Sequence, residues 1–207
     1  SPPLVHVSSL AARAPQVSPY AASKRAAEEE LARRSPPLRR IVVRPPAIYG
    51  PGARATLPIF AQLSRGWLVA PRAASNRFSL LHVDDLVELL VTLLATDLPP
   101  GTVLEPDDGT PGGYGWADLA RSAADQLGRP VRLVGVPGAA MRLAAHASEL
   151  VARLGDRPAA LGRGKVEELL HADWVADTRS LAEVDWRPRL RFSAGFAPTL
   201  AWYKQSG

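Results

Sequence analysis

The stretch Ser18-Pro-Tyr20-Ala-Ala-Ser-Lys24 decides the fold of this chain. It opens a segment rich in Ala, Glu, Leu and Arg that is typical of a helix over residues 19–34, with Ser18 as N-cap and Pro19 in the first turn. In such a helix Tyr20 and Lys24 lie one turn apart on the same face. The apolar stretch Val5-His6-Val7 comes before it, predicts a buried strand and ends at Ser8-Ser9. A serine at the end of that strand can reach the helix face that carries the tyrosine and the lysine.

These three residue types suit a proton-transfer site. A free tyrosine is a poor base at neutral pH because its pKa is about 10. A neighbouring ammonium group favours the phenolate and lowers that pKa, and a general acid or base works best when its pKa lies near the operating pH. A Tyr-x-x-x-Lys pattern alone is weak evidence, since surface helices contain it by chance. The serine-bearing strand before it and the segment Arg44–Gly52 after it make the signal specific.

The elements around this stretch predict an α/β fold. Arg40 to Arg44 read as a strand that stops at Pro45-Pro46, so that strand, helix and strand follow one another and imply a right-handed crossover in a parallel sheet. Residues 78–82 predict a short strand, and Asp84 is expected to cap a helix over 85–96 with the leucines from Leu86 to Leu94 on its inner face. Further helices are expected over 56–65, 116–127, 138–154, 163–171 and 193–204.

Five motifs follow one another along the chain: Ser8-Ser9, Ser18–Lys24, Arg44–Gly52, His82-Val-Asp84-Asp85-Leu86 and Trp186-Arg-Pro188. In this order they resemble the extended short-chain dehydrogenase/reductase superfamily, in its NAD-dependent epimerase/dehydratase branch. The resemblance implies the C-terminal part of a Rossmann-type, doubly wound parallel sheet plus a small, mostly helical substrate-binding lobe. Residues 1–110 would form the former, with a lobe insertion at about 52–80, and residues 111–207 the latter. The glycine-rich turn that opens the family pattern does not occur in this sequence.

The resemblance also assigns roles to particular residues. Tyr20 would act as general acid and base, Lys24 would hold the nicotinamide ribose, and Ser9 would bind the substrate's hydroxyl or carbonyl oxygen. The expected contacts to the cofactor, which is NAD or NADP, are Tyr20, Lys24, Pro45, Pro46, Ala47 and Ile48. The expected contacts to the substrate are Ser9, Tyr49, Arg77 and Phe78.

Two departures from the family pattern bear on the substrate. The loop between Ser9 and Tyr20 is shorter than in the nucleotide-sugar enzymes of the family. Those enzymes carry a phosphate-gripping arginine four residues before the histidine of the His-Val-x-Asp motif, where this chain has Phe78. We therefore expect a less polar substrate than a nucleotide sugar, in an apolar pocket lined by Trp67, Phe78, Met141 and the helix over 138–154.

Composition excludes several other classes of function. Without cysteine, the chain has no disulfide, thiolate metal site or cysteine nucleophile, and it fits a reducing cytoplasm. No spacing of His, Asp and Glu suggests a metal site. The net charge of +5 comes from scattered arginines without interleaved aromatic residues, which argues against nucleic acid as a partner. The longest apolar run, Leu86 to Leu94, is too short to span a membrane.

Three functions remain open at this point. The first is an NAD(P)-dependent oxidoreductase or epimerase that acts on a small molecule. The second is a non-catalytic binding or assembly subunit with the same fold, and the third is an inactive fragment of a parent enzyme. A half-sheet that lacks its first strands would expose an apolar edge, so we expect a homodimer or pairing with a missing N-terminal segment.

Overall fold

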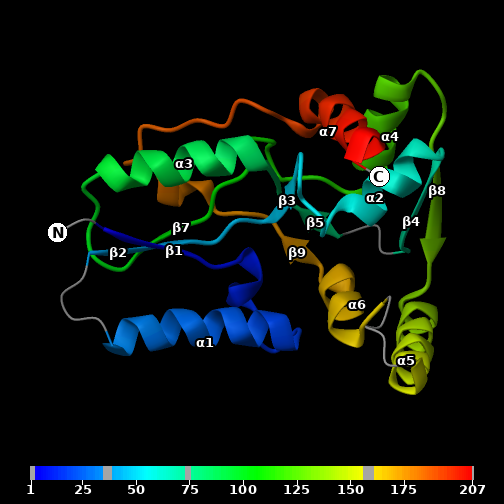
Figure 1. Ribbon diagram of the computed structural model, residues 1–207, viewed down its shortest axis with the longest axis horizontal. Coiled ribbons are helices and arrows are strands. Elements are labelled where there is room, and N and C mark those ends of the chain that lie inside the picture. Colours follow the sequence, from blue (N-terminus) through cyan, green and yellow to red (C-terminus); the bar gives the residue numbers. More distant parts are fainter. Residues whose placement is uncertain (1–2, 35–38, 73–75, 156–160, 207) are drawn as a thin grey trace.

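The computed structural model describes residues 3–34, 39–72, 76–155 and 161–206, and its centre is a parallel sheet (Figure 1). Three strands form this sheet, in the order β1 (Leu4–Val7), β2 (Arg40–Val43) and β7 (Thr102–Leu104). Helix α1 (Pro19–Arg34) connects β1 to β2, and α3 (Val83–Ala95) lies between β2 and β7 in the chain. The two helices lie on opposite sides of the strands in Figure 1. The predicted α/β class with a doubly wound parallel sheet is confirmed.

Beyond the strands, backbone hydrogen bonds hold the departing segments together at the carboxyl edge of the sheet. The amide of Ser8 donates to the carbonyl of Val43 at 2.8 Å, and that of Leu10 donates to the carbonyl of Pro45 at 2.9 Å. The amide of Arg44 donates to the carbonyl of Leu104 at 2.8 Å. The segments that follow β1, β2 and β7 are therefore neighbours where an open α/β sheet binds its ligands.

Helix α1 begins and ends where the sequence predicts. The hydroxyl of Ser18 accepts a hydrogen bond from the amide of Ala21 at 3.0 Å, as an N-cap does, and Pro19 occupies the first helical position, where no amide donor is needed. The same hydroxyl donates to the carboxylate of Glu168 at 2.6 Å. The cap therefore fixes both the start of α1 and its contact with the helix that contains Glu168.

The remaining strands form three short parallel pairs. They are β3 (Ala47–Tyr49) with β6 (Leu80–His82), β4 (Trp67–Pro71) with β8 (Arg132–Val136), and β5 (Arg77–Phe78) with β9 (Asp173–Trp174).

Five more α-helices and two 3₁₀ helices complete the described part of the chain. The α-helices are α2 (Leu57–Ser64), α4 (Trp116–Leu127), α5 (Gly138–Gly155), α6 (Arg163–Leu170) and α7 (Phe192–Ser206). The 3₁₀ helices are η1 (Leu10–Arg13) and η2 (Thr178–Leu181).

Two large apolar clusters form the core. One lies between the central sheet and α3 and includes Leu89, Leu104 and Trp186. The other joins α2, α4 and α7 through residues such as Phe60 and Phe196. The second cluster thus draws on segments from both the middle and the end of the chain.

Three predictions about the segment around α3 are wrong. The expected strand over 78–82 is two strands, because the amide of Ser79 donates to the carbonyl of Trp174 and its hydroxyl donates to Asp107. His82, not Asp84, is the N-cap of α3, since its Nδ1 accepts a hydrogen bond from the amide of Asp84 at 3.2 Å. Leu94 does not face the core: it is 59% exposed.

Candidate active site

Ser9 lies two residues after the end of β1, with an extended backbone, and is the N-cap of η1. Its hydroxyl oxygen accepts a hydrogen bond from the amide of Ala11 at 3.2 Å. Among the described residues, no acceptor is recorded for the hydroxyl proton. Ser9 can therefore still donate a hydrogen bond to an oxygen atom brought to this edge of the sheet.

Tyr20 and Lys24 occupy adjacent turns of α1, beside the end of β1. The ammonium nitrogen of Lys24 lies 3.4 Å from the carbonyl oxygen of Val7 and 5.9 Å from the centroid of the Tyr20 ring. Tyr20 is 48% exposed, and its hydroxyl has no hydrogen-bond partner in the part of the chain that the structure describes. Lys24 thus connects the last residue of the strand to a phenol that remains accessible.

The structure brings Ser9, Tyr20 and Lys24 to the same end of β1. Val7, the residue that Lys24 contacts, is two positions before Ser9, and η1, which Ser9 caps, packs against α1. The arrangement combines a hydrogen-bond donor, a phenol and a fixed positive charge. Chemically, it can bind an oxygen atom and exchange a proton with it.

The segment Pro45–Ile48 lies next to this site. The carbonyl of Pro45 accepts the hydrogen bond from the amide of Leu10, which directly follows Ser9. Pro45 is buried, Pro46 and Ile48 are half-buried and Ala47 is exposed. The segment therefore runs beside Ser9, and Ala47 is its exposed residue.

The expected substrate residues Tyr49, Arg77 and Phe78 are not brought to this site. Tyr49 is fully buried, its hydroxyl donates to the carbonyl of Leu190 at 3.1 Å, and burial raises its pKa. Arg77 forms an ion pair with Asp118 at 2.9 Å and also donates to two backbone carbonyls. The ring of Phe78 packs on that of Trp116, with 4.7 Å between the centroids.

The expected apolar pocket of Trp67, Phe78 and Met141 does not form. Phe78 packs against the cluster of α2, α4 and α7, whereas Met141 is buried with Val166 between α5 and α6. Trp67 is partly exposed on β4. The three residues therefore lie in separate parts of the molecule.

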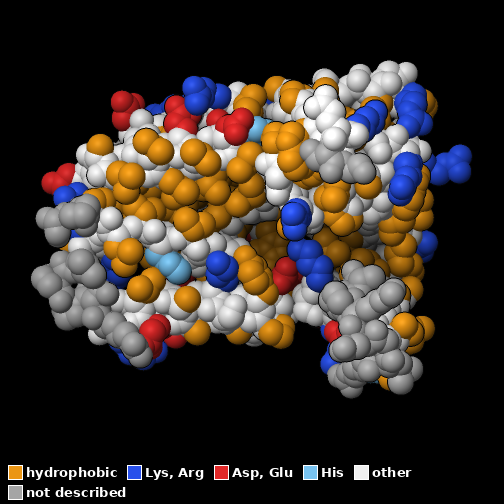
Figure 2. Space-filling model, in the orientation of Figure 1, with side chains coloured by type: hydrophobic (Ala, Val, Ile, Leu, Met, Phe, Trp, Pro, Cys, Tyr) orange, Lys and Arg blue, Asp and Glu red, His pale blue; other side chains and the backbone are white. Residues whose placement is uncertain are grey.

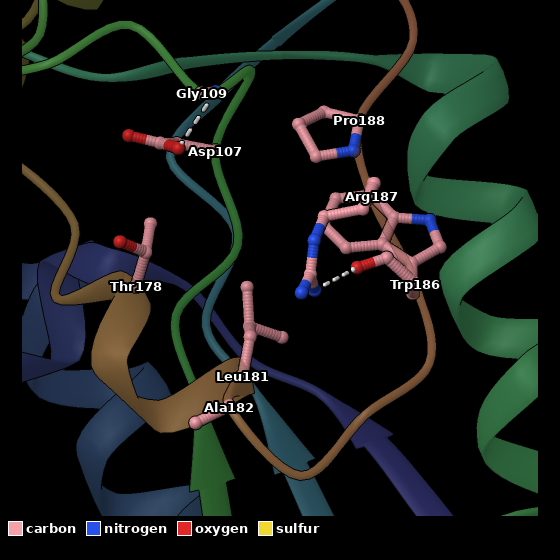
Figure 3. A pocket seen from close by; sticks show the side chains of 8 residues that line it. All are labelled: Asp107, Gly109, Thr178, Leu181, Ala182, Trp186, Arg187 and Pro188. Carbon is pink, nitrogen blue, oxygen red and sulfur yellow. Dashed lines mark hydrogen bonds between the residues drawn. The ribbon is translucent and has the colours of Figure 1, made fainter.

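A cavity of about 290 Å³ lies apart from these residues, between the segment after β7 and the segment around η2 (Figure 3). Its lining includes Asp107, Thr178, Trp186 and Arg187. The carboxylate of Asp107 accepts hydrogen bonds from the amide of Gly109 and the hydroxyl of Ser79. Burial nevertheless raises the pKa of Asp107, with the charge of Asp108 acting in the same direction. None of the candidate active-site residues lines this cavity.

A second cavity, of about 250 Å³, is nearer to the candidate site. Gln16 and Val17, which lead into Ser18 and α1, line one side of it, and Leu170 and His171 at the end of α6 line another. Figure 2 shows that the surface is hollowed between the α1 side and the α5–α6 side of the molecule, with hydrophobic side chains at the floor and basic ones at the rim. A substrate at Tyr20 would have apolar surface within reach.

One pair of charged residues at this edge of the sheet, Glu28 and Arg44, was not predicted from the sequence. Glu28 on α1 is buried and binds Arg44, the residue after β2, and Ser8, the residue after β1. Burial alone would raise the pKa of Glu28, but the hydrogen bonds from Arg44 and Ser8 and the charge of Arg44 outweigh it and lower that pKa. The position of Glu28, two turns after Tyr20 and one after Lys24, was the available signal.

Neither a metal site nor a membrane helix is found in the described ranges. No group of three or more His, Asp or Glu side chains there is arranged to hold a metal ion. No helix in those ranges is long and apolar enough to cross a membrane.

Comparison with known proteins assigns this arrangement to a family. Residues 5–104, which contain β1, α1, β2, α3 and β7, match the NAD dependent epimerase/dehydratase family. These residues belong to that family. The match covers Ser9, Tyr20, Lys24 and Pro45–Ile48, so the motifs that suggested the resemblance lie inside it.

Two curated relatives match across nearly the whole chain. The ceramide reductase of Caulobacter vibrioides (strain NA1000 / CB15N) is 36% identical over 201 residues, which are 97% of this chain and 62% of that protein. The uncharacterized protein YbjS of Escherichia coli (strain K12) is 25% identical over 197 residues, which are 91% of this chain and 58% of that protein. The chain therefore spans about three fifths of the length of these relatives.

Solved structures in this family's fold superpose on most of the chain. Gox2253 matches with a TM-score of 0.69 at 20% identity, over 98% of this chain and 66% of that one. UDP-glucuronic acid 4-epimerase from Bacillus cereus, solved with UDP-glucuronic acid and NAD, matches with a TM-score of 0.68 at 13% identity, over 98% of this chain and 62% of that one. At this level of identity the likeness establishes the fold alone.

Proposed function

We propose that this chain is the catalytic and substrate-binding part of an NAD(P)-dependent oxidoreductase that acts on a hydroxyl or carbonyl group of an apolar, lipid-like molecule. The observation that carries the proposal is the position of Lys24. Its ammonium group lies 3.4 Å from the carbonyl oxygen of Val7, two residues before Ser9, and 5.9 Å from the centroid of the Tyr20 ring. A non-catalytic subunit would not need a cation and a free phenol at the ligand-binding edge of the sheet.

The residues act on the oxygen of the substrate. In the reducing direction, Tyr20 delivers its hydroxyl proton to the carbonyl oxygen, and Ser9 donates a hydrogen bond to the same oxygen. Lys24 stabilises the phenolate that Tyr20 leaves behind, because an opposite charge close by favours the ionised form. In the oxidising direction, the phenolate of Tyr20 takes the proton back from the hydroxyl group.

The residues at this site suit a nicotinamide cofactor, which would supply or accept the hydride when bound. The free hydroxyl of Tyr20 and the ammonium of Lys24 are donors for a ribose, and the segment Pro45–Ile48 lies beside Ser9. The partly exposed side chains of Tyr20 and Lys24 leave room for that contact. The choice between NAD and NADP does not follow from these residues.

Two observations support an apolar substrate. Phe78 stands where the nucleotide-sugar enzymes carry an arginine, and it packs on Trp116 without offering a charge to a phosphate. The relative with 36% identity is a ceramide reductase, and its name points to a lipid substrate. We therefore place a ceramide-like lipid, with its oxygen at Tyr20 and its chain over the apolar floor in Figure 2, ahead of a nucleotide sugar.

Substitution of Tyr20 tests the chemistry. In the full-length protein, Tyr20→Phe is expected to lower kcat for oxidation or reduction of a ceramide-type substrate by about 10²–10⁴-fold, the usual contribution of a general acid or base. The measurement follows NADH or NADPH absorbance with the lipid and, in parallel, with a UDP-sugar. The matched control is Tyr203→Phe, which removes a hydroxyl that donates to the carbonyl of Ala53 instead.

Each outcome is informative. Loss of turnover in Tyr20→Phe but not in Tyr203→Phe supports the proposed reaction. Equal turnover of the UDP-sugar and the lipid would contradict the substrate class. Unchanged turnover in Tyr20→Phe, or bound cofactor without any turnover in the unsubstituted protein, would favour a binding or assembly subunit.

We further propose that the free edge of β1 pairs with another parallel strand, from a cofactor-binding segment or from a second copy. Leu4 and Val7 on this edge are 37% and 38% exposed, although they belong to a parallel sheet. An unpaired apolar edge promotes association. Sedimentation of the 207-residue chain alone is expected to show dimers or larger species, and a monodisperse monomer of 22.1 kDa would contradict this.

A further inference from the structure

A buried ion pair ties helix α1 to the sheet two turns beyond Tyr20. The carboxylate of Glu28 accepts two hydrogen bonds from the guanidinium of Arg44, from Nε to Oε1 at 2.9 Å and from Nη2 to Oε2 at 2.6 Å. The hydroxyl of Ser8 donates to the same carboxylate at 2.5 Å. The side chains of Glu28 and Arg44 are 8% and 12% exposed. One carboxylate on the helix therefore binds the residues that follow two neighbouring strands.

The pair continues into a chain of charges along the carboxyl edge of the sheet. Nη1 of Arg44 lies 3.5 Å from the carboxylate of Glu105, which directly follows β7. That carboxylate also lies 3.3 Å from the guanidinium of Arg13 on η1. The charges thus link α1, the ends of all three central strands and the 3₁₀ helix that Ser9 caps.

Stability does not explain why such a pair is buried. Taking two charges out of water costs free energy, and apolar residues of similar volume often do as well or better. A two-pronged contact between arginine and carboxylate supplies a fixed distance and orientation, because two parallel N–H···O bonds hold the carboxylate in the plane of the guanidinium. Here it fixes the helix that carries Tyr20 and Lys24 against the strand end that carries Ser9.

We propose that Glu28 is a positioning residue, which acts through Arg44 and Ser8 to hold Tyr20 and Lys24 in register with Ser9. Tyr20, Lys24 and Glu28 follow one another at intervals of four residues and so lie along one side of α1. Lys24 contacts Val7 on β1, and Glu28 contacts Ser8, the next residue. A rotation or sliding of α1 that separated Tyr20 from Ser9 would break both contacts. The role in turnover rests on the function proposed above.

The test compares Glu28→Gln with Glu29→Gln. Both remove one negative charge from the same helix, but Glu29 is exposed and pairs with Arg25 on the surface. In the full-length protein, Glu28→Gln is expected to lower kcat about 10- to 100-fold with KM unchanged, because small displacements of a catalytic group have effects of that size. Glu29→Gln is expected to leave kcat unchanged.

A second measurement does not depend on activity. Amide hydrogen exchange in the 207-residue chain is expected to quicken over residues 18–24 in Glu28→Gln relative to Glu29→Gln. Arg44→Lys keeps the charge but loses the two-pronged contact, so it is expected to reproduce both effects. Arg44→Lys replaces Glu28→Gln in both measurements if Glu28→Gln does not fold.

The outcomes separate the two proposals. Reduced thermal stability with unchanged kcat and unchanged exchange over 18–24 would overturn the positioning role, as would full activity in Arg44→Lys. Altered exchange near Tyr20 together with a fully active Tyr20→Phe variant would support the positioning of the helix while contradicting the proposed reaction.

Discussion

The two edges of the central sheet differ in how they are covered. At the β7 edge, the hydroxyl of Ser180 accepts a hydrogen bond from the amide of Glu105 at 3.0 Å, and Leu181, Val184 and Trp186 are buried against the sheet and α3. At the β1 edge, no strand of the described chain pairs with the outer side. Figure 2 shows a band of hydrophobic side chains between α3 and β1.

Apolar side chains are also exposed on helix α3, which contacts β1. Val87, Val91 and Leu94 on the outer side of α3 are 53%, 62% and 59% exposed. Scattered apolar residues are common on protein surfaces, whereas a continuous apolar band marks a contact surface. The chain thus completes one edge of its sheet with its own C-terminal segment and leaves the other suited to a partner.

The largest expected effect lies at the covered edge. Trp186→Ala should lower the free energy of unfolding by about 3–5 kcal/mol, because it removes a large buried side chain and leaves a cavity. Urea denaturation of the 207-residue chain measures this loss. Trp202→Ala, at a partly exposed position on α7, is the control and should cost much less. Equal losses of unfolding free energy in Trp186→Ala and Trp202→Ala would contradict the difference between the covered edge and the exposed surface.

A smaller loss is expected from the hydrogen bonds that hold the C-terminal segment. One carboxylate oxygen of Asp85, which is buried on α3, accepts hydrogen bonds from the amides of Arg189 and Leu190. Asp85→Ala should lower the free energy of unfolding by about 2 kcal/mol, since buried donors lose their acceptor. Asp84→Ala removes an exposed neighbour on the same helix and should cost less than about 1 kcal/mol. If the two variants unfold alike in urea, Asp85 does not hold this segment.

Acid should weaken the contact of Glu28 with Arg44 and Ser8, which holds α1 against the sheet. The pKa of Glu28 is lower in the folded chain than in the unfolded one, so its contribution to stability is complete above the unfolded pKa. That contribution is lost as the pH falls through the lowered folded pKa. The difference in unfolding free energy between the unsubstituted chain and Glu28→Gln should therefore shrink on acidification below about pH 4. A difference that grew instead would contradict the assigned pKa shift.

The difference between these two chains also separates the effect of Glu28 on stability from that of a second titrating group, His82. Burial lowers the pKa of His82, against the opposing charges of Asp84 and Asp85, so protonation of His82 also destabilises the fold as the pH falls. That effect is shared by both chains and cancels in the difference.

The smallest effect on stability is expected on the exposed side of α3. Val91→Lys should change the free energy of unfolding by no more than about 0.5 kcal/mol, because the side chain is exposed in the folded chain. It should nevertheless reduce self-association in sedimentation experiments, since a charge on the apolar band opposes contact. Leu93→Ala on the same helix, at a fully buried position, should cost about 2–5 kcal/mol. Unchanged self-association in Val91→Lys would contradict a contact through the exposed apolar side chains of α3.

Local signals predicted the helices well and the short strands poorly. Ser18 and Pro19 mark the start of α1, and Gly128, in a left-handed conformation, ends α4 where expected. Strands β3, β4 and β7 were not predicted because each is only three to five residues long and is defined by its partner strand, which no local pattern reveals.

The site shows the same limit. The positions of Tyr20 and Lys24 on α1 follow from a fixed helical period, so the sequence suffices to put them on one face. The same period puts Glu28 in line with Tyr20 and Lys24, but only tertiary packing buries Glu28 against Arg44 while Glu29 stays on the surface. Tyr49 was misplaced for the same reason: its motif lies near the site, but its side chain turns into the core.

The sharing of one core by distant segments has a consequence for synthesis. Phe192, Phe196 and Leu200 of α7 complete the apolar cluster that contains Tyr49 and Phe60. A ribosome releases the earlier residues first, so they are exposed until α7 emerges. This apolar cluster cannot be completed before α7 has been made, and a nascent chain stalled before residue 192 would present these aromatic side chains to chaperones.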